Sequence, residues 1–401
     1  MAYDVDSIRS HFPALKTGAA FFDTPGGSQV PDTVATTICD TLVAGISNRG
    51  RESAAARMAD DVVVAARAAM ADLLGSDADG IVFGRSMTQL TYDFARTIAK
   101  TWSPGDEVMV TRLDHDANIR PWVQAAETVG ATVRWADFDP ATGELTADDI
   151  AQQLSDSTRL VAVTGASNLI GTRPPLAEIA ALVHQCGALL AVDGVHLTPH
   201  FPIDVAAIGA DLFACSPYKF LGPHCGVMAG RPNLLAELRP DKLLPATDSV
   251  PEKFELGTLS YELLAGSAAA VDFIASISPA DAGSRRQRIV AAMSAVAAHE
   301  GQLQLRIERA LAELPGVVVH SRAGLRTPTL LLTFVDHDAA ELSRALAGRN
   351  INAPVGSFYA LEASRRLGLH DSGGMRIGLA PYTNAEDVDR LLDGLREALA
   401  A

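Results

Sequence analysis

A single lysine and an upstream carboxylate are the residues of this chain whose types and spacing point most directly to chemistry. Lys219 lies in the run 215–223, which contains no other charged side chain. Asp193 ends the apolar run 188–192. Such a lysine can form a Schiff base with the aldehyde of pyridoxal phosphate (PLP), and such a carboxylate can keep the pyridine nitrogen protonated so that the ring accepts electrons. The pair predicts PLP chemistry, and a lysine on a surface loop is the alternative.

Polar residues that follow other apolar runs supply further candidate groups. Met87 and Thr88 open a predicted helix, whose free amides and hydroxyl suit a phosphate, but residues here also act as ordinary helix caps. His115 can stack on a flat cofactor and move protons, or it can bond the neighbouring carboxylates. Asn168 can donate to a phenolate oxygen, or it can simply form a turn before a glycine.

Four more side chains complete this predicted set. His196, three residues beyond the carboxylate, can reach the phenolate oxygen of the cofactor. Ser216 and Tyr218 flank the lysine and offer hydroxyl groups to the phosphate. Arg376 can hold a substrate carboxylate through its bidentate fork, with a structural ion pair as the alternative.

The elements that must position these groups alternate between strands and helices from residue 80 onward. Strand–helix alternation predicts an α/β fold with a mostly parallel sheet covered on both faces. Ligands bind at the carboxyl ends of such strands, where the candidate residues lie. The predicted strands are 80–84, 107–111, 132–135, 159–164, 188–192 and 212–215, and the predicted helices include 32–46, 53–74 and 176–186.

The pattern changes after residue 259 and predicts a division into domains. Residues 16–260 are expected to form a large cofactor-binding domain, and residues 261–401 a smaller α+β C-terminal domain. Residues 1–15 are expected to form a helical arm that packs on the small domain. The small domain is predicted to contain a helical stretch at 262–314, strands at 316–320, 329–334 and 375–379, and helices at 338–349 and from 384.

Composition limits the possible partners. Of 401 residues, 48% are hydrophobic and 20% charged, as in globular proteins. The net charge of −15 argues against nucleic acid or an anionic membrane as the main partner. No apolar run has membrane-spanning length, and the acidic N-terminus has no signal-peptide pattern, so we expect a cytoplasmic protein. The four cysteines have no metal-type spacing, and no metal site is predicted.

Taken together and in order, these residues resemble the class V aminotransferase group of fold-type I PLP enzymes, and within it the cysteine desulfurase-like proteins. The resemblance covers nearly the whole chain. It implies a PLP-dependent transferase fold with a large domain built on a mostly parallel, seven-stranded sheet and a smaller α+β domain. It is carried by segments 8–15, 22–23, 114–119, 167–172, 192–194, 216–219, 254–258 and 375–379.

The resemblance also implies a role for each candidate residue. Lys219 would carry the cofactor as an internal aldimine, Asp193 would pair with the pyridine nitrogen, and His115 would stack on the ring. Arg376 would bind the substrate carboxylate. The residues implied in binding the rest of the cofactor are Met87, Thr88, Asn168, His196 (where the family usually has Gln), Ser216 and Tyr218.

One further segment implies a partner subunit. Gly257 and Thr258 resemble the segment that one subunit of the family lends to the phosphate site of the other. This implies a homodimer with shared active sites.

The chain departs from the desulfurases at the residue that gives them their activity. A desulfurase needs a thiolate to attack the substrate sulfur. The alignment places Tyr359 where that cysteine stands and Pro354 where a second arginine stands, and no cysteine follows Cys225. We therefore expect an enzyme that acts on an amino acid through an external aldimine and a quinonoid, most simply an aminotransferase. A lyase that cleaves a C–S bond and a PLP-fold protein without turnover are the alternatives.

Overall fold

The computed structural model describes residues 3–277 and 283–400, and its centre is a seven-stranded sheet. The strand order is β2-β8-β7-β6-β5-β3-β4. The strands from β7 to β4 in this order run parallel, whereas β8 is antiparallel to both of its neighbours. The expected mostly parallel α/β sheet is confirmed. The strands are β2 (Ile81–Gly84), β3 (Glu107–Thr111), β4 (Thr132–Ala136), β5 (Thr158–Thr164), β6 (Leu189–Asp193), β7 (Leu212–Cys215) and β8 (Gly226–Gly230).

Helices cover both faces of this sheet because its central strands are apolar on both sides. In β5, Leu160 and Ala162 pack into one core cluster, together with α4 (Met87–Ala99) and α5 (Arg120–Val129). The alternate residues Val161 and Val163 pack into the other cluster. The helices on that second face include α3 (Ala54–Leu74), α7 (Leu176–Gln185) and α10 (Tyr261–Ser276).

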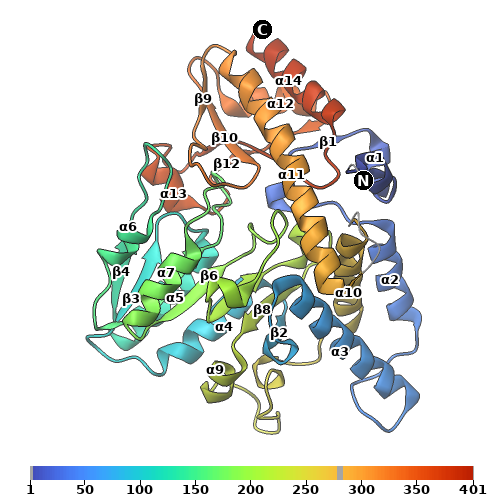
Figure 1. The fold of residues 1–401 in the computed structure, drawn as a ribbon, viewed down its shortest axis with the longest axis vertical. Helices are drawn as coiled ribbons and strands as arrows, with labels where there is room; N and C mark the ends of the chain where they lie inside the picture. The colour runs from blue at the N-terminus through green and yellow to red at the C-terminus, as the bar shows by residue number, and fades with distance from the viewer. Residues whose placement is uncertain (1–2, 278–282, 401) are drawn as a thin grey trace.

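The C-terminal elements form a second sheet, at the top of Figure 1, with strand order β12-β13-β10-β9. All of its neighbouring strands pair antiparallel. The long helix α11 (Arg285–Ala312) runs from the large sheet to this region (Figure 1). The strands are β9 (Val317–Val319), β10 (Thr329–Phe334), β12 (Val355–Gly356) and β13 (Gly374–Gly378), and the helices are α12 (Ala339–Ala347), α13 (Leu361–Arg366) and α14 (Ala385–Leu399).

The N-terminal segment contacts these C-terminal elements. Helix α1 (Val5–Ser10) carries Arg9, whose guanidinium donates to the Asp387 carboxylate at 2.6 Å. Strand β1 (Ala20–Phe21) pairs parallel with β11 (Ile351–Asn352). Residues 1 and 2 of the predicted arm lie outside the described residues, and helix α2 (Asp32–Val43) follows the arm.

Two sequence predictions need correction. Strand β8 was not predicted, because five residues bounded by glycines give too short a pattern. The stretch 262–314 is not one helix, since α10 ends at Ser276 and α11 begins at Arg285, where the Ser284 hydroxyl caps the helix. Part of the predicted stretch, residues 278–282, lies outside the described residues.

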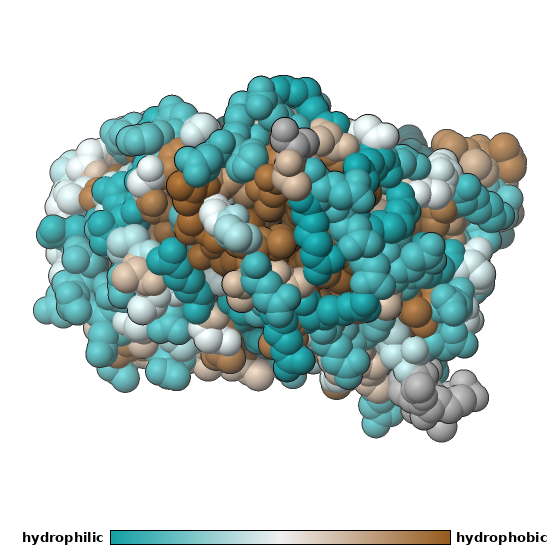
Figure 2. Space-filling view, turned by 90° about the horizontal axis from the view of Figure 1, so that it is seen from above, coloured by the Kyte–Doolittle hydropathy of each residue, from teal (hydrophilic) through white to brown (hydrophobic). Residues whose placement is uncertain are grey.

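The surface is mainly polar where it can be seen. Figure 2 views the molecule from the end that carries α12 and α14 and shows hydrophilic residues around a smaller apolar area. Within the described ranges, no helix is both long enough and apolar enough to span a bilayer.

Candidate active site

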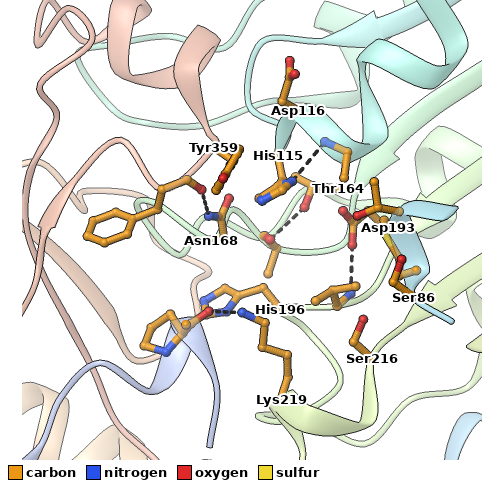
Figure 3. A pocket seen from close by; sticks show the side chains of 18 of the residues that line it. Ser86, His115, Asp116, Thr164, Asn168, Asp193, His196, Ser216, Lys219 and Tyr359 are labelled. Carbon is orange, nitrogen blue, oxygen red and sulfur yellow. Dashed lines mark hydrogen bonds between the residues drawn. The ribbon is translucent and has the colours of Figure 1, made fainter. Parts of the chain in front are cut away.

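A cavity of about 590 Å³ lies where the central parallel strands end. Thr164 and Asp193 are register partners at the ends of β5 and β6, and β7 leads directly into the turn that carries Lys219. Because parallel strands end at one edge of the sheet, residues far apart in sequence meet there (Figure 3).

The cavity gathers most of the residues predicted from the sequence. The predicted residues that line it are Met87, Thr88, His115, Asn168, Asp193, His196, Ser216, Tyr218, Lys219 and Arg376. Gly257 and Thr258 do not line it and are exposed on the surface of this chain. Sequence analysis missed the lining residues Tyr92, Asp116 and Phe358, because nothing in their local patterns distinguishes them from ordinary helix and loop residues.

Lys219 is largely buried, and this environment determines the state of its amine. The pKa of Lys219 is lowered from 10.5 to about 7, because burial and then the Arg376 guanidinium lower it more than Asp193 raises it. The Nζ atom donates a hydrogen bond to the carbonyl oxygen of Pro25. Near neutral pH, a large share of this lysine is therefore the free amine, which is the nucleophilic form.

Asp193 is a buried carboxylate whose negative charge is stabilised by few groups of its own chain. Its Oδ1 accepts a hydrogen bond from the Val195 amide at 3.0 Å. Its pKa is raised to about 6, because burial raises it more than the Val195 hydrogen bond and nearby Lys219 lower it. Within the described residues, no cationic nitrogen lies within 4.0 Å of this carboxylate. A cationic group in the cavity is the partner that this environment lacks.

His115 has one of its two ring nitrogens already occupied. Its Nδ1 accepts the amide hydrogen of Ala117 at 3.0 Å, so the neutral ring carries its proton on Nε2. Burial, together with the charges of Lys219 and Arg376, lowers the pKa of His115 to about 4. The ring is therefore neutral at pH 7 and presents Nε2–H as a donor.

The first turn of α4 closes another side of the cavity. The Ser86 hydroxyl accepts the amide hydrogen of Gln89 at 3.1 Å and is therefore a helix cap. Met87 and Thr88 follow in the first turn, where backbone amides have no partner within the helix. An anion can bind at these amides and at the Thr88 hydroxyl.

Arg376 comes from β13 and is held by a loop that also closes the cavity. Its guanidinium carbon lies 3.6 Å from the centre of the Phe358 ring, and Nη1 donates to the carbonyl of Asn168 at 2.9 Å. Burial lowers the pKa of Arg376 to about 9, and Asp23 opposes this shift. Arg376 therefore remains charged at pH 7 and can hold a carboxylate.

The loop has an unusual backbone at Tyr359, which the sequence analysis expects at the position of the desulfurase cysteine. Phe358 and Tyr359 have φ angles of 51° and 59°, a region that non-glycine residues rarely adopt. The Asp116 amide donates to the carbonyl of Tyr359 at 2.7 Å, and the Asn168 side chain donates to that of Phe358 at 2.9 Å. The Tyr359 ring lies 5.6 Å from the His115 ring, centre to centre.

Comparison with known proteins identifies the family. The aminotransferase class-V family model matches residues 20–391 of the chain. The chain belongs to this family. Class V aminotransferases and the related cysteine desulfurases are PLP-dependent enzymes, so the expected family, fold and cofactor are confirmed.

Proteins similar to this chain include one named aminotransferase-like and others named cysteine desulfurases. The "Aminotransferase-like protein FGM3" of Gibberella zeae is 32% identical over 99% of both chains. A "Cysteine desulfurase" of Dickeya dadantii is 30% identical over 98% of this chain and 96% of its own. The crystal structure of the cysteine desulfurase CsdA from Escherichia coli superposes with a TM-score of 0.88, at 26% identity, over 100% of this chain and 99% of that one.

The donor and acceptor groups of the cavity fit the cofactor of the class V family. His196 Nδ1, Asn168 Oδ1 and Arg376 Nε are buried atoms without a hydrogen-bond partner among the described residues. His196 is held through its other nitrogen, which lies 2.9 Å from the Thr329 hydroxyl. Buried polar atoms are rarely left unpaired, so such a group of them indicates a polar ligand in this cavity.

Proposed function

We propose that this class V family member acts on a free α-amino acid, with transamination as its reaction. The observation that carries the proposal is that the Lys219 amine and the Asp193 carboxylate, from adjacent strand ends, line one cavity with Arg376. PLP supplies an electron sink that stabilises negative charge at the substrate α-carbon.

Each residue of the cavity has a proposed task in holding PLP. Lys219 binds it covalently through its amine, and Asp193 pairs with the pyridine nitrogen, which provides the missing cation. His115 lies against the ring, and Asn168 and His196 face its phenolate oxygen. The phosphate is held by the Met87 amide, Thr88, Ser216 and Tyr218.

Proton movement at the substrate follows from the states of two side chains. Because the pKa of Lys219 is about 7, its released amine can both take a proton from the α-carbon and return one. His115 can only donate from Nε2, since its Nδ1 is occupied. Arg376 holds the α-carboxylate and thereby orients the α-hydrogen toward the lysine.

A homodimer is part of the proposal. Gly257 and Thr258 are exposed in the single chain, and we assign them to the phosphate site of the partner subunit. Leu244 and Leu256 are 97% and 56% exposed, as expected of an apolar surface that a second copy covers. Light scattering of the purified protein should give twice the mass of the chain.

The predicted domain ranges and the cytoplasmic location are retained as part of the same proposal.

Sulfur transfer by a cysteine has little support in this cavity. None of the four cysteines lines it in the described structure. Cys215 and Cys225 are buried, and burial raises the pKa of both thiols, that of Cys225 to about 11, so neither is a ready thiolate.

The experiment that tests the proposal uses the purified protein with PLP. The wild type should show the visible absorption of a lysine-bound cofactor, and Lys219→Ala should lose it, whereas Lys100→Ala, on an exposed lysine, should retain it. Single amino acids are then screened for a spectral change and for the 2-oxo acid product. Sulfide and alanine from cysteine would contradict transamination, and an unchanged spectrum with every amino acid would favour a protein without turnover.

A further inference from the structure

A second cavity, of about 450 Å³, adjoins the first. The two cavities share Gly26, Tyr218, Phe358 and Arg376 in their walls. The second extends from Arg376 toward the N-terminal segment and is lined there by Asp23. A ligand held by Arg376 therefore has room to extend in this direction, away from Lys219.

Asp23 in this second cavity has a buried carboxylate oxygen with no partner among the described residues. Its backbone bridges to Gly378 in β13, two residues from Arg376, and this contact fixes its position. Its Oδ1 is buried and has no hydrogen-bond partner among the described residues. Within the same residues, no cationic nitrogen lies within the 4.0 Å that defines an ion pair with it. Burial raises the pKa of Asp23, and a hydrogen bond from its own backbone amide and the charge of Arg376 lower it by less.

A bound substrate removes the charge that offsets Asp23. By the proposed function, Asp193 is paired with the pyridine nitrogen, and Lys219 is engaged with the cofactor. The α-carboxylate of the substrate then neutralises Arg376. Asp23 loses the one charge that offsets its own, and a buried carboxylate without a counter-charge is unfavourable. A cation on the substrate would restore the balance.

The remaining walls of the second cavity suit a cation. The Tyr218 and His224 rings stack at 4.7 Å between centres, with an interplanar angle of 11°. Together with Phe358, they give the cavity aromatic walls, which attract ammonium and guanidinium groups. Of the side chains that line this cavity in the described structure, Asp23 is the one acid.

We propose that the substrate is an α-amino acid with a cationic side chain, an ammonium or a guanidinium, which binds Asp23 while its α-carboxylate binds Arg376. This inference rests on the proposed function, because it assumes that Arg376 holds the α-carboxylate. The two groups are too far apart for a direct ion pair, so a ligand that bridges them needs charges separated by an intervening chain. A basic amino acid has that form.

The test measures binding rather than turnover. The PLP-loaded protein is titrated with L-arginine and its neutral isostere L-citrulline, and with L-ornithine and L-norvaline. Equilibrium constants are read from the absorbance of the cofactor and independently by calorimetry. A charged hydrogen bond is worth about 1.5–3 kcal/mol, so each basic member of a pair should bind about ten- to a hundredfold more tightly than its neutral partner.

Variants assign that preference to one carboxylate. Asp23→Asn should remove the preference, so that L-arginine and L-citrulline bind with similar affinity, and Asp23→Glu should retain it. Asp371→Asn, which removes an exposed carboxylate outside both cavities, is the matched control and should behave as the wild type.

The outcomes separate this inference from the proposed function. Neutral amino acids that bind as tightly as basic ones in the wild type would overturn the inference alone, as would a preference that survives Asp23→Asn. The first result would mean that Asp23 is protonated in the complex, and the second that another group selects the cationic side chain. If no amino acid changes either signal, both the proposed function and the inference are refuted.

Discussion

The pH dependence of PLP capture by the cofactor-free protein tests the electrostatics of the site directly. Capture needs the free amine of Lys219. With a pKa of about 7, half of this lysine is unprotonated at pH 7. An ordinary lysine, with a pKa of 10.5, would be unprotonated in about one molecule in 3,000 at that pH, from the 3.5-unit difference. The capture rate should rise about tenfold per pH unit below neutrality and level off above pH 8.

The midpoint of this profile is the pH at which the capture rate is half of its maximum. Two variants should move the midpoint in opposite directions. Arg376 lowers the pKa of Lys219, so Arg376→Gln should move the midpoint to higher pH. Asp193 raises that pKa, so Asp193→Asn should move the midpoint to lower pH. Arg365→Gln, on an exposed arginine that pairs with Asp371, should leave it unchanged.

The assay follows the visible absorption of the lysine-bound cofactor after rapid mixing, from pH 5.5 to 10.5. Ionisations of free PLP are common to all variants, so differences between their midpoints report the protein. The reasoning is refuted if the wild-type midpoint lies near that of an ordinary lysine, or if the Arg376 and Asp193 variants shift it in the same direction.

The remaining predictions concern stability and the shape of the phosphate site. Arg67→Met leaves the buried side chain of Glu255 without its cationic partner and should lower the free energy of unfolding, measured in urea, by about 3–5 kcal/mol. Arg96→Met breaks an exposed ion pair and should lower it by less than about 1 kcal/mol. Gly226→Ala places a Cβ 2.2 Å from the backbone at the start of α4 and should weaken PLP affinity in a fluorescence titration, and tight PLP binding by this variant would contradict that assignment. Gly301→Ala meets nothing within 4 Å on helix α11 and should raise the thermal midpoint, with a gain of about 0.5–1 kcal/mol.

The strand ends of the site could be predicted because burial dictates their composition. A strand buried on both faces is a continuous apolar run, and residues 160–163 of β5 and 189–192 of β6 are such runs. Asp193 is therefore conspicuous as the charged residue that ends β6. Lys219 is conspicuous for the same reason, as an isolated charge beyond β7. In both cases the local pattern contains the information that places the residue.

The second cavity could not be predicted from local patterns. Asp23 and Phe358 belong to it because the N-terminal segment bridges to Gly378, a contact between residues more than 350 positions apart. The occupied nitrogen of His115 likewise depends on loop geometry rather than on residue type. The positive φ angles of Phe358 and Tyr359 have no sequence pattern, since neither residue favours that conformation.

The pairing of the chain's first strand with its last elements bears on synthesis. Strand β1 pairs with β11, Tyr3 bonds the carbonyl of Pro381, and the bridge at Asp23 joins β13. A nascent polypeptide that has left the ribosome as far as Lys219 therefore holds its nucleophile but lacks Phe358 and Arg376, which line both cavities. Its first residues gain these partners only after residues 351–381 have been synthesised, so both cavities are completed late in translation.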